Sequence, residues 1–462
     1  MFARMRRLRM CALGAIMVVI FASCDAIDDE TSPFDLSDAN STPTAGMESI
    51  ALGSEMLGRS LSLLNITYAE PVEMPKLMAA GQRGAWKALA QSGLPPPGEV
   101  EYPALNAGLT ETPQQFQARY QGIAGRYSSK TEPLFLAREM IRQAADSLDD
   151  CHTAYLSPKQ LQDQLQRLSG TTRFGGVGVI LRKLPNSDGF TVVEVFENGP
   201  AAKAGMRQGD LITRVDGLLL AGKGIEEVVN LVRGVEGSRV TLVIVRGADV
   251  ESEMAISRAS VSAPVLRSQI LPGNVGYLRF YSFPEPLTGQ VDAALREFEK
   301  ASVHRLIVDL RDNSGGQLDV VTKVTSRFVP KGPLFQSINR AGERVVYQAD
   351  GSYWKPPHSL TVLVNNGTGS GGEIFASAVQ EHGIARLIGV ASSGCVSTGQ
   401  LFPLPDGSAL EIATNRVVSG IRGTELNRIG VKPDETIQIV PEDLANSRDR
   451  QLDRAREIAA KS

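Results

Sequence analysis

A single serine stands among four glycines in the stretch NNGTGSGGEIFASAV, residues 365–379. The apolar run before it is typical of a buried strand and the residues after it of a helix, so Ser370 falls on a strand-to-helix turn. There a serine can project outward, small neighbours let a substrate approach, and the helix N-terminus favours negative charge. These are the properties of a nucleophile elbow, although Ser370 lies directly between two glycines and a serine that only caps the helix would give the same pattern.

A second glycine turn follows another strand of buried type, in LIVDLRDNSGGQ, residues 306–317. The backbone amides of Gly315 and Gly316, together with that of Gly371, could form an oxyanion hole. Such donors typically contribute about 3–4 kcal/mol each to acyl-transfer catalysis. The two turns together predict acyl transfer at a serine nucleophile.

The elements that must position these turns indicate an α+β multidomain protein. At 462 residues the chain is long enough for two to four domains. Residues 265–440 alternate between strand and helix, which predicts a parallel-rich sheet covered by helices. Residues 47–160 predict mostly helix, with a polar, Pro-rich loop before the helical run EPLFLAREMIRQAADSLDD, and residues 441–462 predict a charged terminal helix.

Between these regions, short β-type runs broken by glycine resemble a PDZ domain, which we assign to residues 165–258. The ordered run ENGPAAKAGMRQGDLITRVDG carries most of this resemblance. A PDZ domain binds a peptide C-terminus by adding it as a strand to a sheet edge. The amides of Gly176, Val177 and Gly178 could capture the terminal carboxylate, and the strand that begins at Val179 could pair with the peptide.

Four blocks, LIVDLRDNSGG, VLVNNGTGSGGEIFASAVQEHG, FPLPDGSALEIAT and GVKPD, resemble the C-terminal processing peptidases, serine peptidase family S41. Upstream, TYAEPVEMPKLMAAGQRGAWKAL and LDDCHTAYLSP resemble that family's N-terminal region, so the resemblance covers about residues 47–440. It implies an S41 core of the ClpP/crotonase type over residues 265–440, with Ser370 as the nucleophile. It also implies an endopeptidase that needs no cofactor.

One position departs from the family pattern. The usual general base is a lysine 25 residues after the serine, and here that position holds Cys395, while the lysine's usual glutamine partner falls on Gly399. A cysteine is shorter than lysine, and its thiol is protonated at neutral pH. The Ser/Lys dyad is therefore absent, and another base is needed.

Four histidines are available as that base. His382 lies about 18 Å from Ser370 along the same predicted helix, which is too far. His304 begins a buried strand, and His358 sits in a Pro-rich connection. His152 is left, and it resembles the histidine that tricorn-like relatives of the family use with their serine; the alternative is a purely structural histidine. A neutral imidazole is suited to taking a proton from serine and returning it to the leaving amine.

The cysteines on either side of this arrangement suggest a disulfide. Cys151 precedes His152, and Cys395 occupies the vacated lysine position beside the nucleophile. A bond between them would hold His152 against Ser370, whereas two unrelated free thiols remain the alternative. Glu425 could orient the histidine, as a glutamate does in tricorn-like enzymes, although Asn427 stands at the aligned position.

The N-terminus predicts export. Four arginines precede an apolar run of 12 residues that ends at Ala22, and Ser23 and Cys24 follow, which is the pattern of a secretory signal over residues 1–24. Cys24 resembles the lipidated cysteine of a bacterial lipobox, with Phe21 where Leu is preferred, and residues 25–46 predict a flexible tether. A plain secretory signal is the alternative. We expect an exported protein, periplasmic or at the cell surface, anchored to a bacterial membrane by lipid.

The predicted function is cleavage of exported proteins or peptides, with the PDZ domain selecting substrates by their free C-termini. The net charge of −3 gives no reason to expect nucleic-acid binding, and no cluster has metal-ligand spacing. Loss of the lysine favours an alternative, a catalytically inactive PDZ-containing adaptor lipoprotein. A crotonase-like acyl-CoA enzyme is a third possibility, against which the PDZ domain and export signal argue.

Overall fold

The computed structural model describes residues 43–98, 105, 111–184, 187–247, 250–355, 359–440, 443 and 448–461. Cys24 and His358, both named above, lie outside the described residues. Gly46–Ser462 form one compact unit. In the described part of the chain, no helix has the length and apolar character needed to cross a membrane.

The N-terminal region is a group of packed helices: α1 (Pro43–Thr67), α2 (Met74–Gln91), α3 (Pro113–Tyr127) and α4 (Pro133–Asp146). Their apolar faces form a core that also contains Leu410 and Ile412 from a distant strand. The loop expected before α4 contains a helix instead, so that prediction was wrong. The reason is a capping box: Thr112 Oγ1 accepts the Gln115 N–H, and the Gln115 side chain accepts the Thr112 N–H.

Two short elements, β1 (Ala154–Leu156) and α5 (Pro158–Ser169), lead into the PDZ domain. Its sheet has the strand order β3-β4-β5-β7-β8, with β6 beside β5, and β2 pairs separately with β9. The order places β3 at an edge of the sheet. The elements are β2 (Arg173–Gly176), β3 (Val179–Arg182), β4 (Phe190–Val195), α6 (Pro200–Lys203), β5 (Leu211–Val215), β6 (Leu218–Leu219), α7 (Ile225–Val232), β7 (Arg239–Arg246), β8 (Val250–Ser257) and β9 (Ala259–Ser262).

The main sheet has the order β10-β11-β12-β15-β16-β19, and all neighbours except β10 and β11 are parallel. This confirms the parallel-rich sheet predicted from the alternation of strands and helices. Its elements are β10 (Leu266–Leu271), β11 (Val275–Phe280), α8 (Leu287–Lys300), β12 (Arg305–Asp309), α9 (Leu318–Ser326), β15 (Ser359–Val364), α10 (Gly371–Glu381), β16 (Ala385–Gly389), β19 (Glu435–Thr436) and α12 (Arg450–Lys461).

Alternate residues of these strands face opposite sides of the sheet, as a period of two requires. Leu306 and Val308 of β12 pack with α8, α9 and α10, whereas Ile307 between them packs with Ala455 and Ala459 of α12. Helix α12 lies against β12, β15 and β16 of this sheet. The sheet is therefore covered by helices on both faces.

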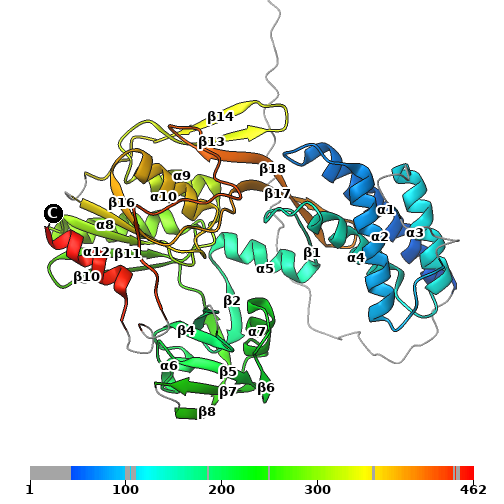
Figure 1. Cartoon of the computed structure of the whole chain (residues 1–462), viewed down its shortest axis with the longest axis horizontal. Coiled ribbons are helices and arrows are strands. Elements are labelled where there is room, and N and C mark those ends of the chain that lie inside the picture. The colour runs from blue at the N-terminus through cyan, green and yellow to red at the C-terminus, as the bar shows by residue number, and fades with distance from the viewer. Residues whose placement is uncertain are drawn as a thin grey trace, which may run out of the picture. The chain divides into compact units, whose positions relative to one another are not determined.

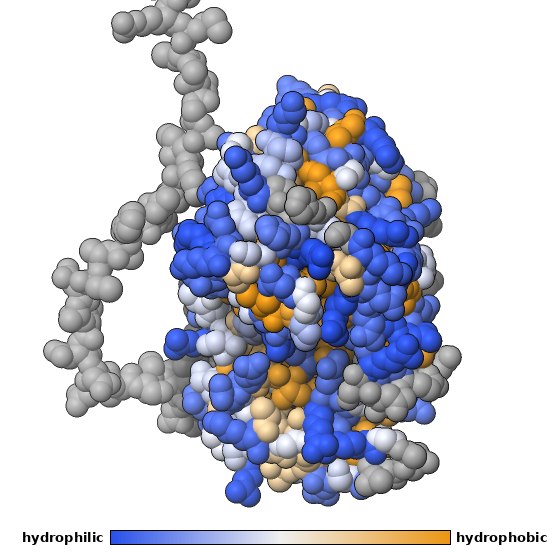
Figure 2. Space-filling model, turned by 90° about the vertical axis from the view of Figure 1, so that its left-hand side faces the viewer, coloured by the Kyte–Doolittle hydropathy of each residue, from blue (hydrophilic) through white to orange (hydrophobic). Residues whose placement is uncertain are grey.

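A second sheet has the order β1-β18-β13-β14, with β17 also paired to β18. Its remaining strands are β13 (Pro333–Asn339), β14 (Arg344–Gln348), β17 (Ser397–Pro403) and β18 (Ala409–Ser419). Through this sheet, β1 from the N-terminal part of the chain lies beside a strand from its C-terminal part (Figure 1). The molecular face in Figure 2 is largely hydrophilic, with several apolar areas scattered over it.

Candidate active site

Three loops meet where the neighbouring parallel strands β12, β15 and β16 end, the place where open α/β sheets bind ligands. Backbone hydrogen bonds connect the loops to one another. The Gly369 N–H donates to Asn313 O (2.8 Å), that of Ser393 to Thr368 O (2.9 Å) and that of Ser370 to Cys395 O (2.8 Å). The two glycine turns singled out in the sequence are thus adjacent in space.

Ser370 lies in the turn between β15 and α10, half-buried, at φ 47° and ψ −116°. A non-glycine residue with positive φ outside the ordinary left-handed region is strained, typically by about 1–3 kcal/mol, and persists only where its surroundings impose it. Its N–H group donates both to Cys395 O and to Glu373 Oε2 (3.0 Å). Such a strained strand-to-helix turn is what a nucleophile elbow requires.

The surroundings that impose it are centred on Glu373, whose side chain is fully buried. The carboxylate accepts hydrogen bonds from Ser392 Oγ (2.5 Å), Gly394 N (2.8 Å) and Cys395 N (3.0 Å) as well as from Ser370. Burial raises the pKa of Glu373, and the hydrogen bonds oppose that effect. We did not single out Glu373 from the sequence, although the spacing Ser-x-x-Glu is that of a capping box.

Gly315 is in direct contact with Ser370. A Cβ at Gly315 would stand 2.5 Å from Ser370 Cβ, 2.9 Å from Ser370 Oγ and 2.7 Å from Gly371 N, so only glycine fits there. Its own N–H donates to Asn313 Oδ1 (2.8 Å). Gly315 therefore makes room for the serine, while its N–H is already engaged. Gly316 forms an isolated parallel bridge with Phe283, which lies in the connection between β11 and α8.

His152 is positioned by β1. Strand β1 pairs with β18, and the Ala413 N–H donates to Thr153 Oγ1 (3.1 Å). The His152 backbone N–H donates to Asp150 Oδ1 (2.8 Å), and its Nδ1 lies 2.9 Å from Ser397 Oγ. Burial lowers the pKa of His152, and Asp150 opposes that shift, so the neutral imidazole is favoured.

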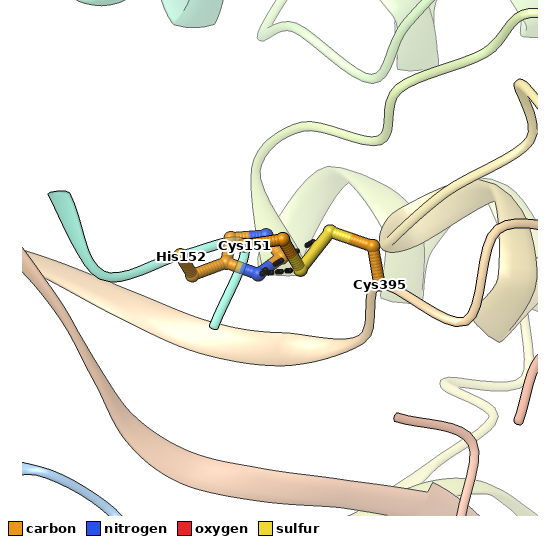
Figure 3. A group of neighbouring side chains, drawn as sticks. All are labelled: Cys151, His152 and Cys395. Atoms are coloured by element: carbon orange, nitrogen blue, oxygen red, sulfur yellow. Dashed lines mark hydrogen bonds between the residues drawn. A yellow bond between two sulfur atoms is a disulfide. The ribbon is translucent and has the colours of Figure 1, made fainter. Parts of the chain in front are cut away.

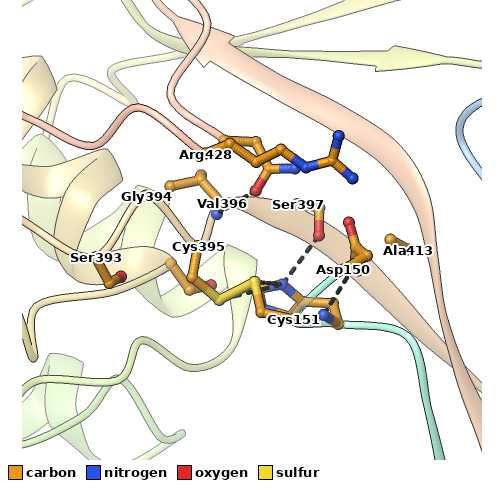
Figure 4. Close-up of a disulfide and its surroundings, with 12 residues drawn as sticks. Asp150, Cys151, Ser393, Gly394, Cys395, Val396, Ser397, Ala413 and Arg428 are labelled. Carbon is orange, nitrogen blue, oxygen red and sulfur yellow. Dashed lines mark hydrogen bonds between the residues drawn. A yellow bond between two sulfur atoms is a disulfide. The ribbon is translucent and has the colours of Figure 1, made fainter. Parts of the chain in front are cut away.

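Ser397, rather than the glutamate expected from the family, is the side-chain partner of the imidazole (Figure 4). Glu425 instead forms an ion pair with Arg416 (3.1 Å) and accepts the Asn427 N–H. Asn427 in turn accepts the Val396 N–H through Oδ1 (3.2 Å). We did not identify Ser397 in the sequence, because nothing local distinguishes it from the other serines of the loop.

Cys151 and Cys395 form a disulfide, with Cα atoms 5.9 Å apart. Figure 3 shows the ring of His152 directly against it, with Nδ1 3.4 Å from Cys151 Sγ and 3.8 Å from Cys395 Sγ. No hydrogen bond joins His152 to Ser370 in the structure. Cys395 links them: its sulfur contacts the imidazole and its carbonyl accepts the Ser370 N–H.

Two other histidines lie away from this arrangement within the described residues. His382 ends α10, where its Nε2 is 2.9 Å from Pro333 O. His304 precedes β12, on the side opposite to the strand ends that meet at Ser370.

The proposed carboxylate-binding turn of the PDZ domain runs through Gly176, Val177 and Gly178, the last at φ 80°. Two of its carbonyls are occupied, since Ala201 N–H donates to Val177 O (2.8 Å) and Phe196 N–H donates to Gly178 O (2.9 Å). Strand β3 pairs with β4 and ends the sheet on its other side. A peptide could therefore be added beside Val179.

The same strand β3 touches the loop that precedes Gly315 and Gly316. Arg182 forms an ion pair and hydrogen bond with Asp312. Glu194 of β4 pairs with Arg279 of β11 (2.9 Å) and also accepts the Tyr281 hydroxyl. Charged contacts thus join the PDZ domain to the strands and loops that carry the serine site.

Comparisons with known proteins agree with this architecture. The sequence model of peptidase family S41 matches residues 274–437, and that of a PDZ domain matches residues 191–246. A carboxy-terminal-processing protease of Bartonella bacilliformis is 32% identical over 295 residues, which are 63% of this chain and 67% of that protein. A protein named as a CtpA-like serine protease, from Staphylococcus aureus, is 28% identical over 339 residues, 72% of this chain and 66% of its own. The matches thus span about two-thirds of these relatives' lengths.

Among solved structures, the photosystem II D1 C-terminal processing protease has a TM-score of 0.54 at 23% identity, covering 88% of this chain and 97% of its own. An S41 protease from Bacteroides fragilis has a TM-score of 0.53 at 21% identity, covering 70% and 90%. At these identities the likeness concerns the fold.

Proposed function

The chain belongs to peptidase family S41, as a carboxy-terminal-processing serine peptidase with a PDZ domain, and from this premise we propose that Ser370 is its nucleophile and His152 its general base. The observation that carries the proposal is the Cys151–Cys395 disulfide. Cys395 stands at the position of the family's lysine, and its bond to Cys151 places the disulfide against the imidazole of His152. A base is thereby supplied from a different part of the chain at the place where the usual one is lost.

In this mechanism His152 acts through Nε2. We assign the ring proton to Nδ1, as a donor to Ser397 Oγ 2.9 Å away, which leaves Nε2 as the acceptor. Nε2 takes the proton of Ser370 as the hydroxyl attacks the scissile carbonyl, and gives it to the leaving amine when the tetrahedral intermediate collapses. Water then attacks the acyl-enzyme by the same route in reverse. Because hydrogen bonds of this kind often form only in the substrate complex, their absence in the free enzyme is compatible with the mechanism.

The negative oxygen of the intermediate is stabilised by backbone amides. The Gly371 N–H opens helix α10, whose N-terminus favours negative charge, and Gly316 follows in the neighbouring turn. We assign these two amides as the oxyanion donors. Gly315, predicted as a third, contributes space beside Ser370, since its N–H is directed at Asn313.

The substrates we propose are exported proteins or peptides with a free C-terminus. The PDZ domain would capture the carboxylate at Gly176 to Gly178 and add the tail beside β3. Export is proposed on the signal-like residues 1–24, and lipid anchoring on Cys24. An anchor of this kind would keep the enzyme at a membrane surface, where exported chains emerge.

The test is cleavage of an unstructured protein by the form that starts at Thr31, comparing wild type with Ser370→Ala and His152→Ala. His382→Ala is the matched control, because His382 lies at the far end of α10. We expect Ser370→Ala to abolish cleavage, His152→Ala to reduce it by about 10²–10⁴-fold, and His382→Ala to leave it unchanged. Full activity of His152→Ala would overturn the assignment of the base.

Cys395 at the lysine position also favours a second function, that of an inactive adaptor which binds peptide tails without cutting them. A serine-directed fluorophosphonate probe separates the two. Labelling of Ser370 in the wild type, and its loss in His152→Ala, supports the peptidase. A wild type that binds a C-terminal peptide yet neither cleaves nor reacts with the probe would establish the adaptor.

A further inference from the structure

We propose that, when the Cys151–Cys395 disulfide is reduced, these two thiolates and the imidazole of His152 bind Zn²⁺ and thereby silence the peptidase. Within the described residues, this is the one group of three or more His, Cys, Asp or Glu side chains suited to hold a metal ion. Its donor atoms all lie within 4.8 Å of one another. Two thiolates and one imidazole are ligands that zinc prefers.

The distances between donors are those that a zinc ion needs. With Zn–S of about 2.3 Å and Zn–N of about 2.1 Å, tetrahedral angles require S···N separations of about 3.6 Å. His152 Nδ1 lies 3.4 Å from one sulfur and 3.8 Å from the other, so the ring already faces both. Once the S–S bond is broken, the sulfurs can separate by rotation about the cysteine side-chain torsions.

The surrounding residues hold the ligands in place without the disulfide. The His152 backbone is hydrogen-bonded to Asp150, and the Cys395 N–H to the buried Glu373 carboxylate. Strand β1 is paired with β18 immediately after His152. We therefore expect the three ligands to stay near one another in the reduced protein, with a water molecule in the fourth position.

The reaction has two balanced steps. Two thiols reduce the disulfide to two cysteine thiols and are themselves oxidised to a new disulfide. Alternatively, a phosphine and one water molecule reduce the disulfide to two cysteine thiols, and the phosphine becomes a phosphine oxide. Zn²⁺ then binds both sulfurs and neutral Nδ1, and the two thiol protons are released.

The effect on catalysis rests on the proposed function. A metal at Nδ1 takes the position of the ring proton, so the remaining proton of the neutral imidazole sits on Nε2. That nitrogen is then a donor and cannot accept the proton of Ser370. Zinc would stop cleavage by fixing the wrong tautomer, while the fold and the PDZ domain stay intact.

The experiment uses the form from Thr31, in which Cys151 and Cys395 are the only cysteines. The protein is reduced with a phosphine, its fold is checked by circular dichroism, and Co²⁺ is added as a spectroscopic probe for zinc. We expect one Co²⁺ per chain, with tetrahedral visible bands and a thiolate-to-cobalt charge-transfer band that Zn²⁺ removes. The oxidised protein is the matched control and should give neither band.

Variants decide which groups bind. Cys151→Ser and Cys395→Ser should each lose the charge-transfer intensity of one thiolate, and His152→Ala should weaken Co²⁺ binding at least tenfold. If the reduced wild type gives no tetrahedral cobalt spectrum, or His152→Ala binds as tightly as wild type, the site is refuted. Cleavage is measured separately: a cobalt spectrum without loss of activity on adding Zn²⁺ would refute the silencing. Failure of the Ser370/His152 mechanism itself would leave the spectrum unaltered, so the two failures are distinguishable.

Discussion

The Oε2 atom of Glu373 lies 3.0 Å from the backbone nitrogen of Ser370, so a buried carboxylate holds the proposed nucleophile in its strained turn. The same oxygen accepts the N–H of Cys395, also at 3.0 Å. One side chain therefore ties the serine to the loop that carries the disulfide. Hydrogen bonds to a charged group contribute about 1.5–3 kcal/mol each, which is enough to offset the strain.

The first prediction concerns Glu373→Gln. In the wild type both carboxylate oxygens of Glu373 accept hydrogen bonds. Glutamine replaces one of these oxygens with an NH₂ group, which cannot accept a hydrogen bond and would face N–H or O–H donors. We expect kcat to fall by at least about tenfold and the protein to lose about 1.5–3 kcal/mol of stability. Both are measured, by peptide cleavage and by urea unfolding. The control is Glu381→Gln at the end of the same helix, whose carboxylate binds Ser419 and Ile421. Equal kcat in the two variants would contradict the role of Glu373.

The second prediction concerns Arg182 and Asp312, which join the PDZ edge strand to the loop that carries Gly315. Both side chains are about one-fifth exposed, at 20% and 22%. In a double-mutant cycle of Arg182→Met and Asp312→Asn, we expect a coupling of about 0.5–1 kcal/mol in kcat/KM. Asn is chosen because position 312 has φ 61°, which Asn tolerates.

The matched control for that cycle is the pair Arg267 and Glu197, which also links the PDZ domain to the core but is 44% and 81% exposed. We expect its coupling to be near zero, since solvent screens exposed pairs. If the two cycles give the same value, the Arg182–Asp312 contact does not couple the domain to the site.

The third prediction concerns pH. Because burial lowers the pKa of His152, the neutral base persists below the ordinary histidine value. We expect the acid limb of kcat/KM to lie below pH 6.5, with activity present above that limb and lost as pH falls through it. The profile is measured on the oxidised enzyme with a chelator present. A limb at or above 6.5, or an unchanged limb in the residual activity of His152→Ala, would count against His152.

The fourth prediction concerns the disulfide. The Cys151–Cys395 bond joins residues 244 positions apart. In the chain-entropy model, a cross-link that closes a span of this length stabilises the protein by at most about 5 kcal/mol. We expect Cys151→Ser to lower the urea midpoint, because the unfolded chain is no longer cross-linked. We also expect it to reduce cleavage, because the hydrogen bonds to Asp150 and Glu373 keep His152 and Cys395 near one another without fixing their separation. The double variant, with both cysteines as serine, should resemble the single one. An unchanged midpoint and unchanged cleavage would show that the bond contributes nothing to either.

The features of this site that could be predicted from the sequence are those determined by residues adjacent in the chain. The turn at Ser370 was visible because a buried strand and a helix flank it, and the glycine turn at Gly315 for the same reason. The disulfide was inferred from the position of Cys395 in the family pattern. None of these steps needed knowledge of how distant strands pair.

The rest depends on long-range pairing that no local pattern reveals. Ser397 meets His152 because β1 pairs with β18, which lies beside β17. The partners of Glu373 arrive in the loop after β16, which is next to β15 in the sheet. Glu425 was expected near the histidine, and it is paired with Arg416 instead. Comparison with the family pattern therefore did not identify Ser397 as the partner of His152.

The bond between Cys151 and Cys395 makes a covalent ring that encloses the PDZ domain and Ser370 but excludes helices α1 to α4 and α12. A second protease that cuts once anywhere within this ring, for example at the exposed turn at Gly247, would open it without releasing a fragment. The piece with His152 and the piece with Ser370 would stay joined through their sulfurs. Damage to the PDZ domain would therefore leave His152 and Ser370 covalently joined until the disulfide is reduced.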